Sequence, residues 1–210
     1  MERIEFVLPK DIEKRSFEII ESELTEKIDE KIKPIVKRVI HTTADFSYEK
    51  SLVFSENAVE TALEAIKNGA SIVTDTNMAK AGINKKALSK FGGNVYCFMA
   101  DEDVAEKAKK DGTTRATASM EKASQMDERV IIACGNAPTA LIKLYELIKE
   151  NKINPYLIIG VPVGFVNVVE AKELIMEAEC QYIVARGRKG GSNVAAAICN
   201  ALIYMAGGRE

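Results

Sequence analysis

The chain has 210 residues, of which 47% are hydrophobic and 29% charged, a balance that fits one globular domain over residues 1–210 with a sizeable core. Its formal net charge of −2 at pH 7 excludes a strongly basic or acidic surface, so we expect no nucleic-acid or membrane partner, and any anion site must be local. The beginning of the chain lacks the apolar segment of a signal peptide, and no run approaches the roughly 18 apolar residues of a membrane span, which predicts a cytoplasmic protein.

The first predicted element is a long helix over residues 11–33, whose apolar residues recur at helical spacing. Asp11 is suited to its N-cap, and Pro34 disfavours helix at the preceding residue and is expected to end the element. Arg15 lies early in this helix, where its side chain can turn back toward a site. The alternative is a surface arginine, which the spacing alone favours.

The next stretch, residues 36–48, holds His41, the only histidine of the chain. Imidazole is the one side chain that titrates near neutral pH without help, at about pH 6.5, so any such proton chemistry falls to His41. Arg38, Thr42, Thr43 and Asp45 surround it with polar groups. The alternative is a structural histidine bonded to a backbone carbonyl.

The rest of the chain alternates between short apolar runs and helical patterns. Strands are predicted at residues 70–74, 95–99, 129–134, 156–160 and 182–186, and helices at 55–68, 78–91, 103–110, 114–126, 138–150, 166–178 and 192–206. Five apolar strands separated by helices indicate a parallel sheet with helices on both faces, which is a doubly wound α/β fold. No linker, repeat or low-complexity segment divides it.

Ligands of such sheets bind beyond the carboxyl ends of the strands, so the loops that leave those ends should carry the chemistry. These loops are residues 74–77, 100–103, 135–138, 161–165 and 186–193. In the third, free N–H groups beyond Gly135 and Asn136 are expected to be open to an anion or a carbonyl. In the fourth, Val161, Val163 and Phe165 are expected to form an exposed apolar rim for a flat ligand, with a tight structural turn as the alternative.

The last of these loops places Arg186, Arg188 and Lys189 among glycines just before a helix, which favours an anion. It matches neither G-x-x-x-x-G-K-S/T nor G-x-G-x-x-G, so nucleotide binding has weak support. Arginine suits planar carboxylates, and Arg15, Arg38 and Arg115 are further candidates. The alternative is a solvated basic turn.

Four cysteines lie far apart in apolar runs or in an Ala-rich helical segment, without a C-x-x-C pair. They are Cys97, Cys134, Cys180 and Cys199. This pattern predicts buried, reduced thiols and neither a disulfide nor a metal site.

Six blocks in order resemble the precorrin-8X or cobalt-precorrin-8 methylmutase family of cobalamin biosynthesis, and the likeness covers nearly the whole chain. The blocks are R-V-I-H-T-T-A-D-F at 38–46, T-D-T-N-M at 74–78, T-T-R-A at 113–116, G-N-A-P-T-A-L at 135–141, G-V-P-V-G-F-V-N at 160–167 and A-R-G-R-K-G-G-S at 185–192. The resemblance implies a flavodoxin-like fold, a homodimer and an isomerase that moves a methyl group from carbon 11 to carbon 12 of the macrocycle by a 1,5-shift, giving hydrogenobyrinate or cobyrinate.

The resemblance also implies roles for individual residues. His41 corresponds to the family's catalytic acid, and Arg38, Arg115 and Arg15 to its substrate-binding arginines. The remaining residues that we expect to bind the tetrapyrrole substrate are Thr42, Asn77, Asn136, Arg186 and Arg188. Thr42 or Thr43 is also a candidate to orient the imidazole.

The implied isomerisation requires no redox or group-transfer cofactor, so we expect none. Two other classes stay open from the sequence. One is a nucleotide- or sugar-phosphate-binding α/β enzyme that uses the 186–192 loop for phosphate, and the other is a non-catalytic tetrapyrrole carrier. The sequence does not decide whether the substrate contains cobalt.

Overall fold

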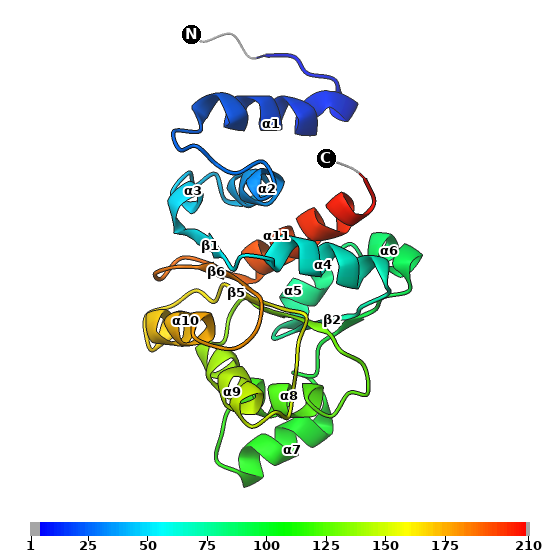
Figure 1. The fold of residues 1–210 in the computed structure, drawn as a ribbon, viewed down its shortest axis with the longest axis vertical. Coiled ribbons are helices and arrows are strands. Elements are labelled where there is room, and N and C mark those ends of the chain that lie inside the picture. Colours follow the sequence, from blue (N-terminus) through cyan, green and yellow to red (C-terminus); the bar gives the residue numbers. More distant parts are fainter. Residues whose placement is uncertain (1–4, 209–210) are drawn as a thin grey trace.

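A six-stranded β-sheet forms the centre of the fold in the computed structural model, which describes residues 5–208 (Figure 1). The strands are β1 Leu52–Phe54, β2 Ile72–Thr74, β3 Val95–Tyr96, β4 Ile131–Cys134, β5 Leu157–Gly160 and β6 Tyr182–Ala185. Across the sheet they follow the order β1-β6-β5-β4-β2-β3. The order reverses between β2 and β4, so the loops that leave these two strands diverge at a place where ligands of α/β sheets commonly bind.

The sheet corrects the expectation of five strands that are all parallel. The strands β2 to β6 lie where the sequence predicts them and pair in parallel. The sixth strand, β1, pairs antiparallel with β6 and places Leu52 opposite Ala185. It has three residues and only one of them is buried, so it offers no apolar run by which the sequence could predict it.

Helices cover both faces of the sheet. The α-helices are α1 Ile12–Glu23, α2 Lys33–Thr43, α3 Tyr48–Ser51, α4 Ala58–Lys67, α5 Asn77–Gly82, α6 Lys85–Leu88, α7 Glu102–Lys110, α8 Arg115–Ala123, α9 Pro138–Lys149, α10 Val168–Met176 and α11 Ser192–Ala206. None of the helices within residues 5–208 combines the length and the apolar character needed to cross a bilayer.

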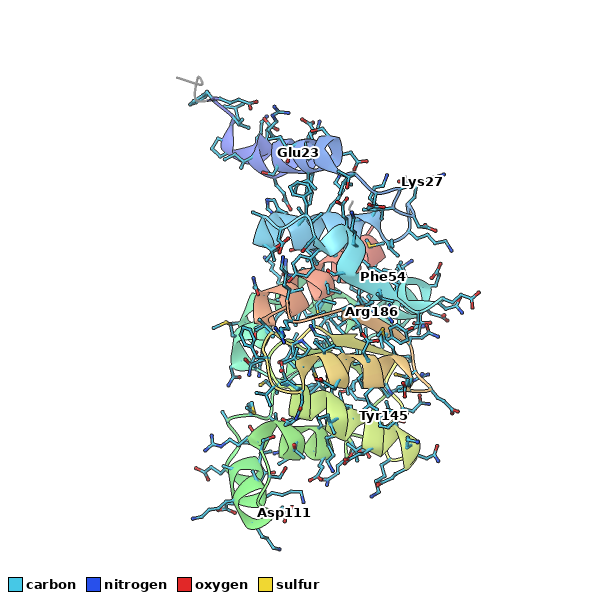
Figure 2. The ribbon with its side chains drawn as sticks, turned by 90° about the vertical axis from the view of Figure 1, so that its left-hand side faces the viewer. Glu23, Lys27, Phe54, Asp111, Tyr145 and Arg186 are labelled. Carbon is cyan, nitrogen blue, oxygen red and sulfur yellow. The ribbon has the colours of Figure 1, made fainter. Side chains whose placement is uncertain are left out.

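Alternate residues of the central strands pack into two separate cores. In β4, Ile131 and Ala133 share a core with α2, α4 and α11, whereas Ile132 and Cys134 share a core with α8, α9 and α10. Successive strand residues are therefore all buried, which explains why the strands are continuous apolar runs. The layers follow one another along the long axis of the molecule (Figures 1 and 2).

The N-terminal helix differs from the prediction. α1 ends at Glu23, because Leu24 has an extended backbone, and the chain crosses to α2 without helical structure. Ile28 is buried from this irregular segment, so the apolar spacing over residues 11–33 reflects core contacts and not one continuous helix. Pro34 lies in the first turn of α2, where no N–H bond is lost, and it begins a helix instead of ending one.

The predicted helix at residues 78–91 is also divided. It forms α5, α6 and a 3₁₀ turn at Ser89–Phe91. Ile83 is extended between the two α-helices, and the Asn84 side chain accepts a hydrogen bond from the Ala87 N–H to begin α6. An asparagine in the middle of the pattern was the signal for this break, since its side chain favours an N-cap over a helix interior.

α1 forms an outer layer over α2 (Figures 1 and 2), and Glu23 marks this layer at the end of the molecule opposite Asp111. Ile20 packs toward the core, whereas Ile12 and Ile19 are exposed. α1 therefore uses one side against the rest of the fold and leaves apolar side chains on another.

Candidate active site

His41 lies in the last turn of α2 with its side chain exposed. Its ring packs against Phe17 of α1, with 5.2 Å between the ring centroids and an interplanar angle of 34°. The free carbonyl groups at this end of a helix carry partial negative charge, which attracts a cation. The imidazole is thus supported on one side by an aromatic ring and accessible to a ligand on the other.

The end of α2 is fixed by its own side chains. Ala44 takes a left-handed conformation and its N–H donates to the Ile40 carbonyl at 2.7 Å. The Thr42 hydroxyl donates to the Arg38 carbonyl at 2.9 Å, and the Thr43 hydroxyl donates to the Val39 carbonyl at 2.8 Å. Both hydroxyl protons therefore go to the helix backbone and not to the imidazole, contrary to the expectation that one of them orients His41.

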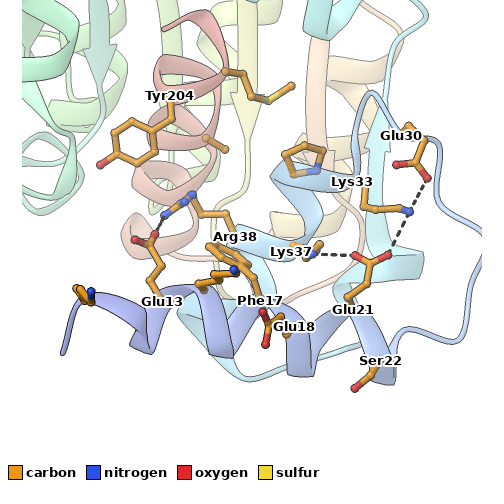
Figure 3. A pocket seen from close by; sticks show the side chains of 15 residues that line it. Glu13, Phe17, Glu18, Glu21, Ser22, Glu30, Lys33, Lys37, Arg38 and Tyr204 are labelled. Carbon is orange, nitrogen blue, oxygen red and sulfur yellow. Dashed lines mark hydrogen bonds and ion pairs between the residues drawn. The ribbon is translucent and has the colours of Figure 1, made fainter. Parts of the chain in front are cut away.

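Arg38 lies one turn before His41 and is held by three groups (Figure 3). Its guanidinium carbon lies 5.0 Å from the centroid of the Phe17 ring and 4.9 Å from that of Tyr204, while Nη1 lies 3.0 Å from Oε1 of Glu13. Its side chain is only 15% exposed. Stacking between two rings fixes the plane of the guanidinium, so Arg38 is preorganised.

Arg38 lines a cavity of about 910 Å³ between α1, α2 and the end of α11 (Figure 3). Its lining contains four lysines and four glutamates, and Lys33 and Lys37 both pair with Glu21. Arg15 is not part of this lining. Its guanidinium forms ion pairs with Glu5 and Glu18 on the exposed side of α1, so it does not turn back as the sequence allowed.

The loop between β4 and α9 is not the open anion site that the sequence predicts. The buried Asp75 carboxylate accepts hydrogen bonds from the N–H groups of Gly135 at 2.9 Å and of Asn136 and Ala137 at 2.8 Å each. Burial raises the pKa of the Asp75 carboxyl, and these three bonds oppose that rise. The N–H groups expected to be free for a ligand are therefore already used by the protein.

The apolar rim of the β5–α10 loop is only partly as predicted. Val163 is 48% exposed and Phe165 is 81% exposed, and Val166 extends the patch. Val161 is completely buried. Its N–H donates to the Cys134 carbonyl and its carbonyl accepts from the Gly191 N–H, so its backbone extends the pairing of β5 by one residue into the core. The rim is therefore displaced toward the start of α10.

The β6–α11 loop carries the predicted basic residues on its surface. Arg186 forms an ion pair with Glu173, and the Arg188 guanidinium carbon lies 5.5 Å from the centroid of the Phe165 ring. Lys189 pairs with Asp45, in the turn that follows α2. This ion pair places the arginine loop next to the end of the His41 helix.

Lys172 of α10 was missed by the sequence reasoning. It is completely buried beneath the β6–α11 loop, and its ammonium donates to the carbonyls of Gly187 at 2.7 Å and Lys189 at 2.8 Å. The available signal was its place in an apolar helical segment, four residues after Val168 and three before Ile175, which are both buried.

Two hydroxyl contacts draw several helix starts to the same edge of the sheet. Thr76 bonds Ser192 at 2.8 Å, and Thr114 bonds Thr139 at 2.9 Å, which joins the starts of α5 and α11 and those of α8 and α9. The exposed predicted residues at this edge are Asn77, Arg115, Asn136, Arg186 and Arg188. Arg15 and Arg38 belong instead to the region of α1 and α2, and His41 lies on α2 close to the link between the two regions.

The four cysteines are free, and three of them are buried as predicted. Cys180 is only half-buried, which departs from the prediction. Burial raises the pKa of the Cys180 thiol to about 11 and that of Cys199 to about 12. Across residues 5–208 no three His, Cys, Asp or Glu residues are grouped to hold a metal ion.

Comparisons with known proteins cover the whole site. The model of the precorrin-8X methylmutase family matches residues 11–205. The cobalt-precorrin-8 methylmutase of Priestia megaterium is 43% identical over 201 residues, which are 95% of this chain and 89% of that protein. The cobalt-precorrin-8 methylmutase of Leptospira interrogans is 41% identical over 211 residues, with 96% of each chain covered. The solved structure of precorrin-8x methyl mutase from Thermus thermophilus superposes with a TM-score of 0.87 at 40% identity, over 94% of this chain and 98% of that one.

Proposed function

The chain belongs to the precorrin-8X methylmutase family, and we propose that it is the isomerase that moves a methyl group from carbon 11 to carbon 12 of cobalt-precorrin-8 or precorrin-8X in cobalamin biosynthesis. The observation that carries this proposal is the family match, which spans residues 11–205 and so includes His41 and every loop at the carboxyl edge of the sheet. Cobalt-precorrin-8 is the first substrate to test, because at least four relatives above 40% identity are named for it.

His41 is the proposed acid. A protonated imidazole donates its proton to the macrocycle, which makes the carbon that receives the methyl group electron-poor, and takes the proton back after the shift. Acid catalysis of this kind typically contributes about 100- to 10,000-fold. The exposure of His41 and its support by Phe17 favour this role, since the ring is accessible and its position is restricted.

The proposed substrate is a broad apolar macrocycle with carboxylates at its rim. Phe165 and Val163 offer apolar surface for its face, and Arg186, Arg188 and Arg115 offer guanidinium groups for its carboxylates. Arg186 and Arg188 lie on the loop that Lys189 ties to the end of the His41 helix, which supports a shared site.

We also propose the flavodoxin-like class for the fold and a homodimer for the assembly. Five strands pair in parallel in the order β3-β2-β4-β5-β6, and this order supports the flavodoxin-like class. The exposed apolar residues of α1, Ile12 and Ile19, support an interface between copies, because burying them would remove apolar surface from water. Sedimentation of the purified chain tests the dimer.

The decisive experiment is incubation of the purified protein with each substrate in turn, followed by mass spectrometry and absorbance. A product of unchanged mass with absorption at longer wavelength is expected, because the methyl shift removes a saturated position from the conjugated path. A mixture of methyl-labelled and otherwise tagged substrate should show no exchange of label. Label found on the tagged partner or on the protein would refute an intramolecular shift, and tight binding of both substrates without turnover would indicate a carrier.

A further inference from the structure

Lys172 has an unusual environment for a lysine. It is among the largest completely buried side chains of the described chain, and it lies on α10 directly beneath the β6–α11 loop. Its two bonding partners are both backbone carbonyls, of Gly187 and Lys189. A buried cation is costly unless its bonds are well made, so a methionine or leucine would fill this position at lower cost if packing were the only requirement.

No carboxylate within residues 5–208 pairs with Lys172. Burial accordingly lowers the pKa of its ammonium group to about 8. The two loop carbonyls therefore stabilise the buried ammonium group, and the ammonium group in turn fixes the orientation of these carbonyls. Such mutual dependence indicates that the contact serves the conformation of the loop.

Lys172 is one of several contacts of the loop, which is also fixed by the Lys189–Asp45 ion pair and by the Arg186 N–H, which donates to the Ser51 carbonyl at 2.8 Å. Gly187 has a φ of +80°, a conformation that leaves its carbonyl free to turn toward α10. The Arg188 carbonyl accepts from the Gly164 N–H at 3.2 Å, and the Gly191 N–H donates to the Val161 carbonyl at 2.9 Å. Both of these bonds join the loop to the β5–α10 loop, so the two loops are positioned together above Lys172.

We propose that Lys172 is a positioning residue of the active site, which holds the β6–α11 loop in the conformation that presents Arg186 and Arg188 to the substrate's carboxylates. Through the Lys189–Asp45 ion pair the same contact fixes this loop relative to the end of the His41 helix. The proposal rests on the proposed function for the identity of the ligand. The claim that Lys172 fixes the conformation of the β6–α11 loop does not depend on the proposed function.

The test compares wild type with Lys172→Met, which keeps the length of the side chain and removes its donors. The control is Lys67→Met, the same substitution at an exposed position at the end of α4. Hydrogen exchange is measured for peptides that contain the amides of Gly164 and Gly191, and for a β5 peptide that contains the amide of Ile158. Steady-state kinetics are measured with cobalt-precorrin-8 and precorrin-8X.

In Lys172→Met we expect exchange at Gly164 and Gly191 to rise about tenfold while Ile158 is unchanged, because only the loop is released. KM should rise about tenfold with kcat nearly constant, because the arginines bind and do not react. Lys67→Met should match wild type. If Lys172→Met does not fold, Lys172→Gln, which keeps a neutral donor, is measured in its place.

Unchanged loop exchange in the folded variant would overturn the proposal, and so would raised exchange with an unchanged KM. A loss of kcat at constant KM would also overturn it, since that result would place Lys172 in the chemical step. If wild type converts neither substrate, the proposed function fails, whereas the exchange measurement still decides whether Lys172 holds the loop.

Discussion

Lys189 forms an ion pair with Asp45 across 144 positions of the sequence, with 2.6 Å between Nζ and Oδ2. The Lys189 ammonium holds the pKa of the Asp45 carboxyl below its usual value, and a hydrogen bond with Ser47 acts in the same direction. The pair joins the loop that carries two predicted substrate-binding arginines to the turn directly after the His41 helix. Two parts of the candidate site that are remote in sequence are thereby fixed relative to each other.

His41→Ala is expected to lower kcat by at least about 100-fold and to change substrate affinity far less, because the imidazole acts on the macrocycle in the transition state. Turnover is followed by absorbance, and affinity by equilibrium titration of the same variant. Near-normal turnover would remove His41 from the mechanism.

Arg38→Ala should weaken substrate binding more than Arg38→Lys, since lysine keeps the charge but not the flat group held between Phe17 and Tyr204. Each ring contact of the arginine is worth about 0.5 to 2 kcal/mol. Affinity should also fall with rising salt. The matched control is Arg129→Ala, which removes an arginine stacked on Tyr156 outside the candidate site.

Substrate whose carboxylates have been esterified separates charge from shape in the same titration. Its affinity should be lower and insensitive to salt. Esterified substrate that binds as well as the free acid would contradict charge-assisted binding by the predicted substrate-binding arginines.

Asp75→Asn should destabilise the fold by about 2 to 4 kcal/mol. In wild type both carboxylate oxygens accept from backbone N–H groups, whereas in the variant an amide NH₂ replaces one of these oxygens and faces an N–H donor. Urea unfolding measures the loss. Asp111→Asn, at a surface ion pair with Lys107, is the control and should change stability little. Equal stability of the two variants would show that the Asp75 bonds contribute nothing net.

Gly190→Ala should cost about 3 kcal/mol or more, because an added Cβ would lie 2.1 Å from the Val161 carbonyl oxygen, a backbone atom that cannot move alone. Gly187→Ala is the control. It has a φ of +80° but no atom within 4 Å of an added Cβ, so it should cost only about 1 to 2 kcal/mol. Equal losses of unfolding free energy would mean that the backbone at Gly190 can shift away from Val161 at little energetic cost.

Lys172 predicts a pH dependence of stability. Its pKa is lowered to about 8 in the folded protein from 10.5, so between these values the unfolded chain binds more protons than the folded one. The contribution of Lys172 to the free energy of unfolding should therefore rise as the pH increases from about 8 to about 10.5, by up to about 3 kcal/mol. The buried thiols of Cys180 and Cys199, whose pKa is raised, act in the opposite direction at alkaline pH, but they are the same in Lys172→Met, so the difference between the two proteins isolates Lys172. Urea unfolding of wild type and Lys172→Met at several pH values measures this difference. A difference that stays constant with pH would contradict the lowered pKa of Lys172.

The sequence predicted the positions of the parallel strands well because each is a short run buried on both faces, as at residues 131–134. It failed where the spacing of apolar residues did not reveal the backbone. Leu24 ends a helix although the apolar pattern continues, and Pro34 begins the next one. In both cases tertiary burial maintains the pattern, so periodicity alone cannot separate one helix from two joined by a buried segment.

The candidate site shows a similar division. The sequence brings out the exposed arginines and His41, since charged and rare side chains are visible in it. It could not predict that Asp75 binds the amide of Gly135, because the two residues are 60 positions apart and only the order of β2 and β4 brings them together. The role of Lys172 could not be predicted either, because its partners are backbone carbonyls, which every residue has and which therefore give no signal in the sequence.

The two outer strands of the sheet, β1 and β3, have three and two residues. An incoming strand would find almost no unpaired backbone at either border, so a second copy cannot add to the sheet to make a continuous one. We therefore expect any assembly of the described part of the chain to use helices and loops, and the exposed Ile12 and Ile19 of α1 are apolar residues that such a contact could bury.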